Sequence, residues 1–414
     1  MIKVIHLADL HLGIDRYGST NPETGLSLQV EDFLKAFDEV IDYTVNWGAD
    51  IFLFCGDTYK SRDPSQTQQR EFARRIARLL NNHVAVFLLV GNHDLPNARG
   101  LANSLEIFQA LGVGNVTVAS SAGTFNVQTG QGPVQIVALP WATRAALLTR
   151  EDYKNNTIDT LNKVIEGKIT DIIQFEAESL DPNLPSILAG HLTHSMAVVG
   201  SERGLYLSHD YMLPASVLAN PAFDYVALGH IHKTQIIELP VPVVYAGSLQ
   251  RLDFGEEDQE KGFYTLEIDP GKQRGERLKS YNFVGVNARR FLTIDVKVAP
   301  DDLDPTSTVI RHIAKQSEAV KDAVVRLRIH LHSDTPGVIR DAEIRRALQE
   351  AHHIASISRE IETRSRPRLG GISPEGLSPM TALEEYMKLV NMEPDRRKVL
   401  TEYAEKLINE FTSG

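Results

Sequence analysis

Five short apolar runs in this sequence each end at residues that commonly bind metal ions. Runs of this length, rich in β-branched residues and bounded by turn residues, predict buried strands. In an open α/β sheet the carboxyl ends of such strands converge, and the polar side chains placed there converge with them. The repeated arrangement predicts a layered α/β domain with a metal site at the strand ends. The five segments are Asp9-Leu-His11, Gly56-Asp57, Gly91-Asn92-His93-Asp94, Gly190-His191 and Gly229-His230-Ile-His232.

The side chains in these segments indicate which ions fit. Carboxylate, imidazole and amide donors together suit manganese, iron or zinc better than calcium. A shared aspartate can bridge two ions about 3.5–4 Å apart, which is the spacing of two-metal hydrolases. Such a pair clamps a phosphate and activates a water in line with the leaving group. Each segment alone also fits an ordinary turn, whereas all five in this order favour the metal site.

The composition narrows the class of protein. The chain has 414 residues, of which 42% are hydrophobic and 23% charged, so we expect a globular protein of two or three domains. Its net charge of −11 argues against binding nucleic acid through bulk charge alone. No apolar stretch approaches the ~18 residues of a membrane span, and the start lacks a signal-peptide layout. The single cysteine, Cys55, excludes an internal disulfide. These features predict a cytoplasmic protein without membrane contact.

The order of predicted elements divides the chain into four parts. Strands and helices alternate through residues 1–285, which predicts the α/β domain. Residues 286–363 predict a smaller α+β domain, with strands at Arg290–Val298 and Ala323–His332. Residues 364–378 are rich in Pro, Gly and Ser, which is typical of an extended linker.

Two amphipathic helices are predicted in the last part, residues 379–414. Apolar residues recur at helical spacing in both, so each helix carries an apolar stripe. Helices this short are marginal alone, and the stripes therefore predict a partner groove, with folding back on the chain's own domain as the alternative. The stripes comprise Leu383, Tyr386, Met387 and Val390, and then Leu400, Tyr403, Leu407 and Phe411.

The five segments resemble the motifs of the calcineurin-like metallophosphoesterases, over about residues 1–270. The resemblance implies two central sheets flanked by helices, with a smaller α+β capping domain and a C-terminal helical hairpin. Within that family the chain is most similar to the nuclease subunits of the SbcCD type. The segments that carry this closer similarity are Ile5–Gly13, Phe223–His232, and Val244–Ser248 followed by Lys261-Gly262.

The resemblance also implies a role for each site residue. It assigns Asp9, His11, Asp57 and His232 to one ion, and Asp57, Asn92, His191 and His230 to the other. The ions expected are two divalent metals, manganese above all. His93 is expected to be catalytic, by stabilising the transition state or protonating the leaving oxygen, with Asp94 orienting it. Lys60 stands where some relatives carry a second histidine, which leaves strand polarity open.

The implied activity is two-metal hydrolysis of DNA, as exonuclease and endonuclease, in double-strand-break repair and the processing of DNA ends or hairpins. The implied partners are DNA, positioned by the smaller domain, and an SbcC-type coiled-coil ATPase bound through residues 379–414. Arg289 and Arg290 are candidate phosphate contacts, as is the segment Arg364-Ser-Arg-Pro-Arg368, with plain surface charge as the alternative. The other functions considered are a phosphoprotein phosphatase, a cyclic-nucleotide phosphodiesterase and a non-catalytic scaffold.

A homodimer is also implied, through apolar helical faces after the second and third segments. The alternative for these faces is the protein's own core. The residues concerned are Phe72, Ile76, Leu79, Leu101, Leu105 and Phe108.

Overall fold

The computed structural model describes most of the chain, in two compact units. The first unit runs past the boundary predicted at residue 285 and takes in two later segments: it comprises residues 1–293, 316–326 and 348–356. The second comprises residues 294–315, 327–347 and 357–414. Apart from Ser378, the predicted linker lies outside the described residues. The described ranges are 1–96, 100–144, 156–198, 200, 210–333, 335–362, 378–389 and 392–412.

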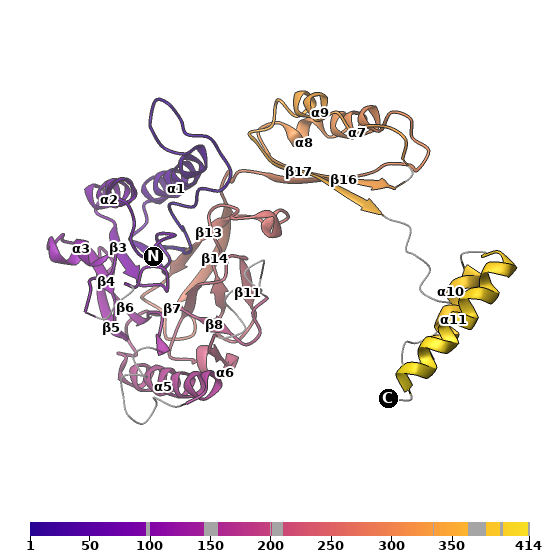
Figure 1. The fold of residues 1–414 in the computed structure, drawn as a ribbon. Coiled ribbons are helices and arrows are strands. Elements are labelled where there is room, and N and C mark those ends of the chain that lie inside the picture. The colour runs from indigo at the N-terminus through magenta and orange to yellow at the C-terminus, as the bar shows by residue number, and fades with distance from the viewer. Residues whose placement is uncertain are drawn as a thin grey trace. The chain divides into compact units, whose positions relative to one another are not determined.

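Two mixed six-stranded sheets form the centre of the first unit (Figure 1). The first has the order β14 (Leu278–Gly285), β13 (Gly262–Ile268), β1 (Ile2–Leu7), β2 (Ile51–Phe54), β3 (Ala85–Leu89) and β4 (Val116–Ala119). The second has the order β11 (Gln235–Ile237), β12 (Val243–Tyr245), β10 (Tyr225–Gly229), β7 (Ser186–His191), β6 (Gly132–Leu139) and β5 (Gly123–Thr129). Strands β1 to β4 run parallel, as do β6, β7, β10 and β12, so their carboxyl ends share one edge of each sheet.

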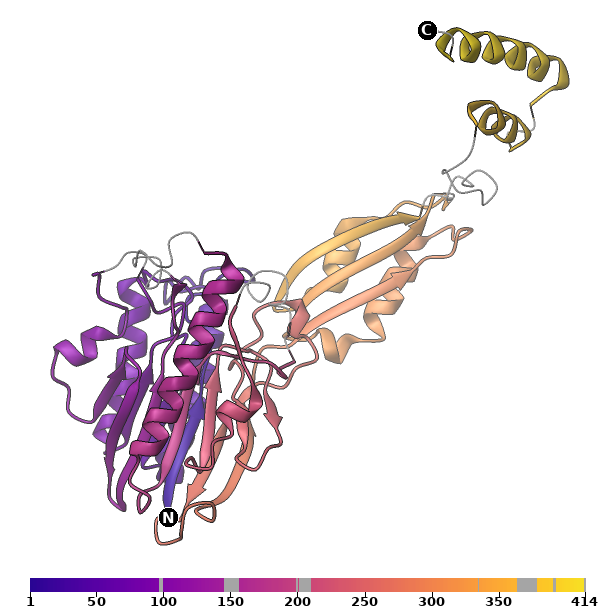
Figure 2. The same cartoon turned by 90° about the horizontal axis from the view of Figure 1, so that it is seen from below.

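Helices cover the outer faces of both sheets (Figures 1 and 2). Helices α1 (Leu28–Trp47) and α2 (Gln66–Asn81) pack on the first sheet, and α5 (Ile158–Ser179) packs on the second. A third apolar layer lies between the two sheets. The predicted layered α/β fold, with a further α+β part and C-terminal helices, is confirmed. Shorter elements of this unit are α3 (Glu106–Ala110), α6 (Ala215–Leu218), α8 (Ser317–Val320), the 3-10 helix η3 (Phe254–Glu256), and strands β8 (Thr193–His194) and β9 (Met212–Leu213).

Local sequence signals start the long helices where the structure places them. Ser27 caps α1 by accepting a hydrogen bond from the backbone N–H of Val30. Ser65 and Gln68 form a reciprocal capping box at the start of α2. Both caps fix the helix that follows a ligand-bearing loop, so they help to hold the site's loops in place.

A buried histidine links the two sheets. His6 on β1 contacts the hydroxyl of Tyr225 through Nδ1 at 3.1 Å and the carbonyl of Leu228 through Nε2 at 3.2 Å. Burial lowers the pKa of His6 to about 3, so its imidazole is neutral. The ring therefore donates from Nε2 to β10 and accepts the Tyr225 hydroxyl at Nδ1, which ties the sheets together close to the predicted ligands.

Most of the apolar residues suggested for a dimer interface belong to the core. Phe72, Ile76, Leu79, Leu105 and Phe108 are all buried in the layer between α1, α2 and the first sheet. That part of the interface prediction is wrong, because these side chains are buried in the protein's own core. Leu101 is 62% exposed. The homodimer itself stays a prediction.

Arg289 and Arg290 are engaged within the chain, so the expectation of phosphate contacts there is not supported. Arg289 donates to both carboxylate oxygens of Asp32, at 2.7 and 2.5 Å, and to the carbonyl of Asp322. Arg290 donates to the carbonyls of Glu318 and Lys321. The Asp32 side chain is only 7% exposed, which makes the pair a structural anchor.

We expect Arg289→Glu to lower the free energy of unfolding by about 3–5 kcal/mol, because it replaces the guanidinium beside the buried Asp32 carboxylate with a second negative charge. Chemical denaturation measures this. The double variant Asp32→Asn/Arg289→Gln should recover much of the loss, since it removes both charges. An Arg289→Glu protein as stable as the wild type, with weaker DNA binding alone, would contradict the structural role.

A three-stranded sheet and four further helices complete the described chain. The sheet has the order β15 (Phe291–Lys297), β16 (Val324–His332) and β17 (His353–Glu362), and α7 (Pro305–Ala314) packs against α9 (Asp341–Ala347). Helices α10 (Pro379–Leu389) and α11 (Pro394–Thr412) pack against each other. Among the described helices, none is both long enough and apolar enough to traverse a bilayer.

Candidate active site

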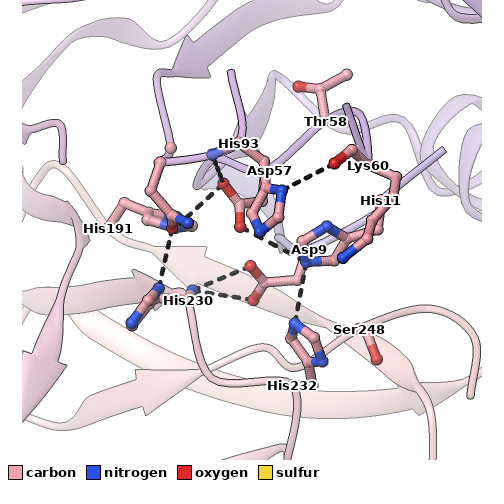
Figure 3. A network of polar contacts seen from close by, with 12 residues as sticks. Asp9, His11, Asp57, Thr58, Lys60, His93, His191, His230, His232 and Ser248 are labelled. Atoms are coloured by element: carbon pink, nitrogen blue, oxygen red, sulfur yellow. Dashed lines mark hydrogen bonds and ion pairs between the residues drawn. The ribbon is translucent and has the colours of Figure 1, made fainter. Parts of the chain in front are cut away.

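The structure brings the predicted site residues together at the carboxyl ends of the strands. Loops after β1, β2 and β3 supply the residues from the first sheet, and β7 and β10 supply those from the second. Figure 3 shows Asp9 and Asp57 in the middle, with His191 and His230 on one side and His11 and His232 on the other. The site therefore lies where the two sheets meet at their common edge.

The donor atoms form two groups around Asp57. One carboxylate oxygen of Asp57 lies 3.5 Å from His11 Nε2, and the other lies 3.4 Å from His191 Nε2. Asn92 Oδ1 lies 3.0 Å from His191 Nε2 and 3.1 Å from His230 Nδ1. Asp57 can thus offer one oxygen to the donor group on each side. The groupings within ligand distance are Asp9, His11 and His232; His11, Asp57 and His93; and Asp57, His191 and His230.

The charge balance of the site fits bound cations. Burial raises the pKa of Asp9 to about 7, even though the charges of His191 and His232 oppose this. Burial would lower the pKa of His191, but the neighbouring Asp57 outweighs it and raises the value to about 9. Asp9 and Asp57 are two buried carboxylates in one site, and they need positive charge beside them, which a divalent ion supplies.

The spacing of two imidazoles also fits a metal. The Nε2 atoms of His11 and His232 lie 2.9 Å apart, and the Nδ1 of His11 is buried without a hydrogen-bond partner among the described residues. Imidazole nitrogens about 2.0–2.1 Å from one ion lie about 2.9 Å apart when their bonds to the ion are at right angles, as in a six-coordinate site. The residues present therefore fit a metal on this side of Asp57.

Backbone strain is concentrated at the ligands. Asp9, His11, Asp57 and His230 have φ angles of 52°, 47°, 59° and 95°, in the left-handed region that non-glycine residues seldom adopt. Each such residue costs about 1–3 kcal/mol, and persists only where the surrounding structure holds it. These angles direct the four side chains into one site. The packed core around the loops stabilises this strained backbone.

Asp94 does not orient His93, so that prediction is wrong. The Asp94 carboxylate, fully buried, accepts hydrogen bonds from the backbone N–H groups of Asp57, Thr58 and Gly91 at 2.9, 3.0 and 2.9 Å. The Nδ1 of His93 lies 2.8 Å from the carbonyl of Lys60 and donates to it. Asp94 thus fixes the loop that carries Asp57, because a carboxylate satisfies three backbone donors there at once.

Three residues near the ligands were not anticipated from the sequence. Glu256 lies 3.0 Å from His232 Nδ1, Asp210 lies 3.1 Å from His230 Nε2, and Trp141 packs on the ring of His230 with centroids 4.7 Å apart. Burial would raise the pKa of Glu256, but the hydrogen bond from His232 and the charge of Lys261 lower it to about 2. Glu256 and Asp210 follow no apolar run, and Trp141, which does follow a predicted strand, is not a metal-ligand residue type, so the strand-end pattern gave no signal for them.

Two glycines allow the loops to meet. A Cβ on Gly229 would lie 2.2 Å from the carbonyl oxygen of Cys55, across the junction of the two sheets. A Cβ on Gly91 would lie 2.3 Å from Asp57 Oδ1 and 2.4 Å from the Asp57 backbone nitrogen. Both positions therefore exclude a side chain.

We expect Gly91→Ala to reduce phosphoester hydrolysis by about 100-fold, because the added methyl group displaces the shared carboxylate by a fraction of an ångström or more. Steady-state kinetics on bis-p-nitrophenyl phosphate measures this. Gly114→Ala is the matched control, since a Cβ there meets nothing within 4 Å. Full activity in Gly91→Ala would show that the position of Asp57 is not critical.

The match to a family model agrees with this site. Residues 2–234 match the family model of the calcineurin-like phosphoesterases. Solved structures with similarity to the chain include a dimetal phosphatase from Danio rerio, at 10% identity and a TM-score of 0.38, covering 64% of this chain and 92% of that one. Another is TT1561 of Thermus thermophilus, at 12% identity and a TM-score of 0.35, covering 68% and 98%. A third is the purple acid phosphatase PPD1 from yellow lupin (Lupinus luteus), at 14% identity and a TM-score of 0.37, covering 69% and 53%. The family match spans more than half of the chain and includes the ligand-bearing loops of both sheets, and the chain therefore belongs to the calcineurin-like phosphoesterases, which are metal-dependent hydrolases of phosphate esters.

Proposed function

We propose that this chain is a two-metal DNA nuclease of the SbcD type, which hydrolyses phosphodiester bonds together with an SbcC-type ATPase. The observation that supports the chemistry is the Asp57 carboxylate, whose two oxygens face histidines of two separate donor groups. In the proposed assignment Asp9, His11, Asp57 and His232 hold one ion. Asp57, Asn92, His191 and His230 hold the other.

Two divalent ions held there would supply Lewis-acid stabilisation of the phosphate and lower the pKa of water. The chain's own residues would act on the phosphate alongside the ions. His93 is half-buried beside His11, with ring centroids 4.8 Å apart, and its Nδ1 is engaged by the Lys60 carbonyl. Its Nε2 is then the ring atom that can serve the transferring phosphate, either by stabilising charge or by passing a proton to the leaving oxygen.

Parts of the chain beyond the family match favour a large substrate and a protein partner. The match ends at residue 234, and the α+β segment and the paired helices α10 and α11 follow it. On these helices Tyr386, Val399 and Tyr403 are 54%, 55% and 67% exposed, whereas Met387 is buried. Exposed apolar side chains on a helix pair are typical of helix-in-groove recognition.

The alternative is a phosphatase or cyclic-nucleotide phosphodiesterase on the same scaffold, because every phosphoesterase of this kind needs the same donor groups. The test is manganese-dependent cleavage of end-labelled single- and double-stranded DNA, run beside p-nitrophenyl phosphate, a phosphopeptide and a cyclic nucleotide. We expect DNA cleavage that chelation abolishes. Turnover of a monoester or cyclic nucleotide with intact DNA would favour the alternative.

We expect a chain that ends at Gly370 to keep its metal-dependent hydrolysis and to lose the ATPase, because it lacks α10 and α11. The measurement is co-purification of the full-length and shortened chains with an SbcC-type ATPase, with nuclease assays on both. In the full-length chain, Tyr403→Glu should weaken the association at least 10-fold, since it places a charge on the exposed apolar face. Undiminished binding by the shortened chain would refute this use of the hairpin.

A further inference from the structure

A buried acid lies behind one of the proposed ligands. Glu256 ends the short helix η3 and is fully buried. Its Oε1 lies 3.0 Å from Nδ1 of His232, and its Oε2 accepts from Lys261 Nζ at 2.7 Å and from the backbone N–H of Leu252 at 3.1 Å. The carboxylate thus has three donors, two of them on one oxygen.

Lys261 keeps this acid ionised. Its side chain is fully buried, and its Nζ also donates to Ser248 Oγ at 2.8 Å and to the His232 carbonyl at 3.2 Å. A buried ammonium requires a charged partner, which Glu256 provides. An ionised carboxylate can only accept hydrogen bonds, so Nδ1 of His232 carries a proton, and in the neutral ring the lone pair is therefore on Nε2.

We propose that Glu256 is a positioning residue, which fixes His232 in the tautomer whose Nε2 can bind a divalent ion. Nε2 of His232 already lies 2.9 Å from Nε2 of His11, which is assigned to the same ion. Carboxylates that hold a metal-binding imidazole in this way are worth about 10–100-fold in metal affinity. The inference rests on the ligand assignment within the proposed function, and it does not depend on DNA being the substrate.

The variant Glu256→Gln tests it at nearly constant shape. The amide offers one acceptor oxygen to three donors, and two of them, Lys261 and Leu252, lie on the same side. The amide nitrogen therefore turns toward His232, so that Nδ1 becomes the acceptor and Nε2 becomes protonated. We expect calorimetric titration with Mn²⁺ to show one of two binding events weakened by about 10–100-fold and the other retained. Nitrogen-15 NMR of labelled histidine should show His232 Nε2 changing from unprotonated to protonated.

Two further variants separate positioning from folding. In Glu256→Leu/Lys261→Met both buried charges are gone, which is often neutral for stability, yet His232 has lost its acceptor. We expect this protein to fold, and one of its two Mn²⁺ binding events should still be weakened. Glu257→Gln is the matched control, because Glu257 is the next residue and bonds to Thr293 instead; its Mn²⁺ binding should equal that of the wild type.

Wild-type Mn²⁺ affinity in either Glu256→Gln or the folded double variant would overturn the proposal. So would a His232 tautomer that Glu256→Gln leaves unchanged. Failure of the nuclease function has a different signature: a wild type that binds two Mn²⁺ ions and leaves DNA intact.

Discussion

Replacing Asp57 with alanine is expected to bring phosphoester hydrolysis down to the level measured without metal. Asp57 is the only proposed ligand shared by the two ions, and its two oxygens face His11 and His191 at 3.5 and 3.4 Å. Its loss leaves both donor groups one carboxylate short, so neither ion is held with its charge balanced. Kinetics on bis-p-nitrophenyl phosphate, with the number of Mn²⁺ ions bound per chain, measures the effect.

The fold should survive this change. Asp57 Oδ1 also accepts the backbone N–H of His93 at 2.8 Å, and leaving that donor unpaired costs about 1–3 kcal/mol. The variant Asp57→Asn keeps an acceptor oxygen and tolerates the left-handed backbone, so it separates lost metal from lost stability. Mn²⁺ should raise the melting temperature of the wild type but not of either variant, because only an ion bound to the folded state stabilises it. Asp258→Ala, at an exposed carboxylate, should behave as the wild type.

His93→Ala is expected to lower the turnover number by about 100- to 10,000-fold while both ions stay bound. The reason is that His93 is assigned to the reacting phosphate and not to a metal. If His93 protonates the leaving oxygen, cleavage of DNA should fall much more than cleavage of bis-p-nitrophenyl phosphate, because p-nitrophenolate leaves readily without a proton. A similar fall on both substrates would indicate stabilisation of the transition state instead.

Metal content decides whether the assignment of His93 is right. His93 belongs to one of the donor groupings, with His11 and Asp57, in which the ligand atoms all lie within 4.8 Å of one another. If His93→Ala binds one ion fewer than the wild type, His93 is a ligand. His83→Asn is the control, because His83 is exposed and Asn accepts its φ of 60°.

The strand-end pattern predicted which edge of each sheet carries the site, because that edge depends on topology alone. Apolar runs at Ile51–Cys55 and Val84–Val90 became parallel strands of the first sheet, and Tyr225–Leu228 became a strand of the second, so the ligands of each sheet follow carboxyl ends at one edge. The fold class was predictable for the same reason. The left-handed backbone at Asp9, His11 and Asp57 was not, since no residue type there demands it and only the packed structure holds it. The meeting of the two edges depends on how the sheets pack on each other.

Contacts between residues far apart in the sequence could not be predicted from the sequence. Glu256 lies 24 residues beyond His232, and Asp94 reaches back 37 residues to the Asp57 backbone. No periodicity links such pairs, because their approach depends on how separate loops pack. The expected pairing of His93 with its neighbour Asp94 failed for this reason, as the carbonyl of Lys60 holds the ring instead.

The number of ions bound by the active wild-type protein decides whether this is a two-metal hydrolase. The full chain, freed of metal by chelation, is titrated with Mn²⁺ while binding and hydrolysis of bis-p-nitrophenyl phosphate are followed together. Two ions should bind per chain, and hydrolysis should rise with occupancy of the second site. Full hydrolysis with a single ion bound, or hydrolysis that persists in excess chelator, would contradict this.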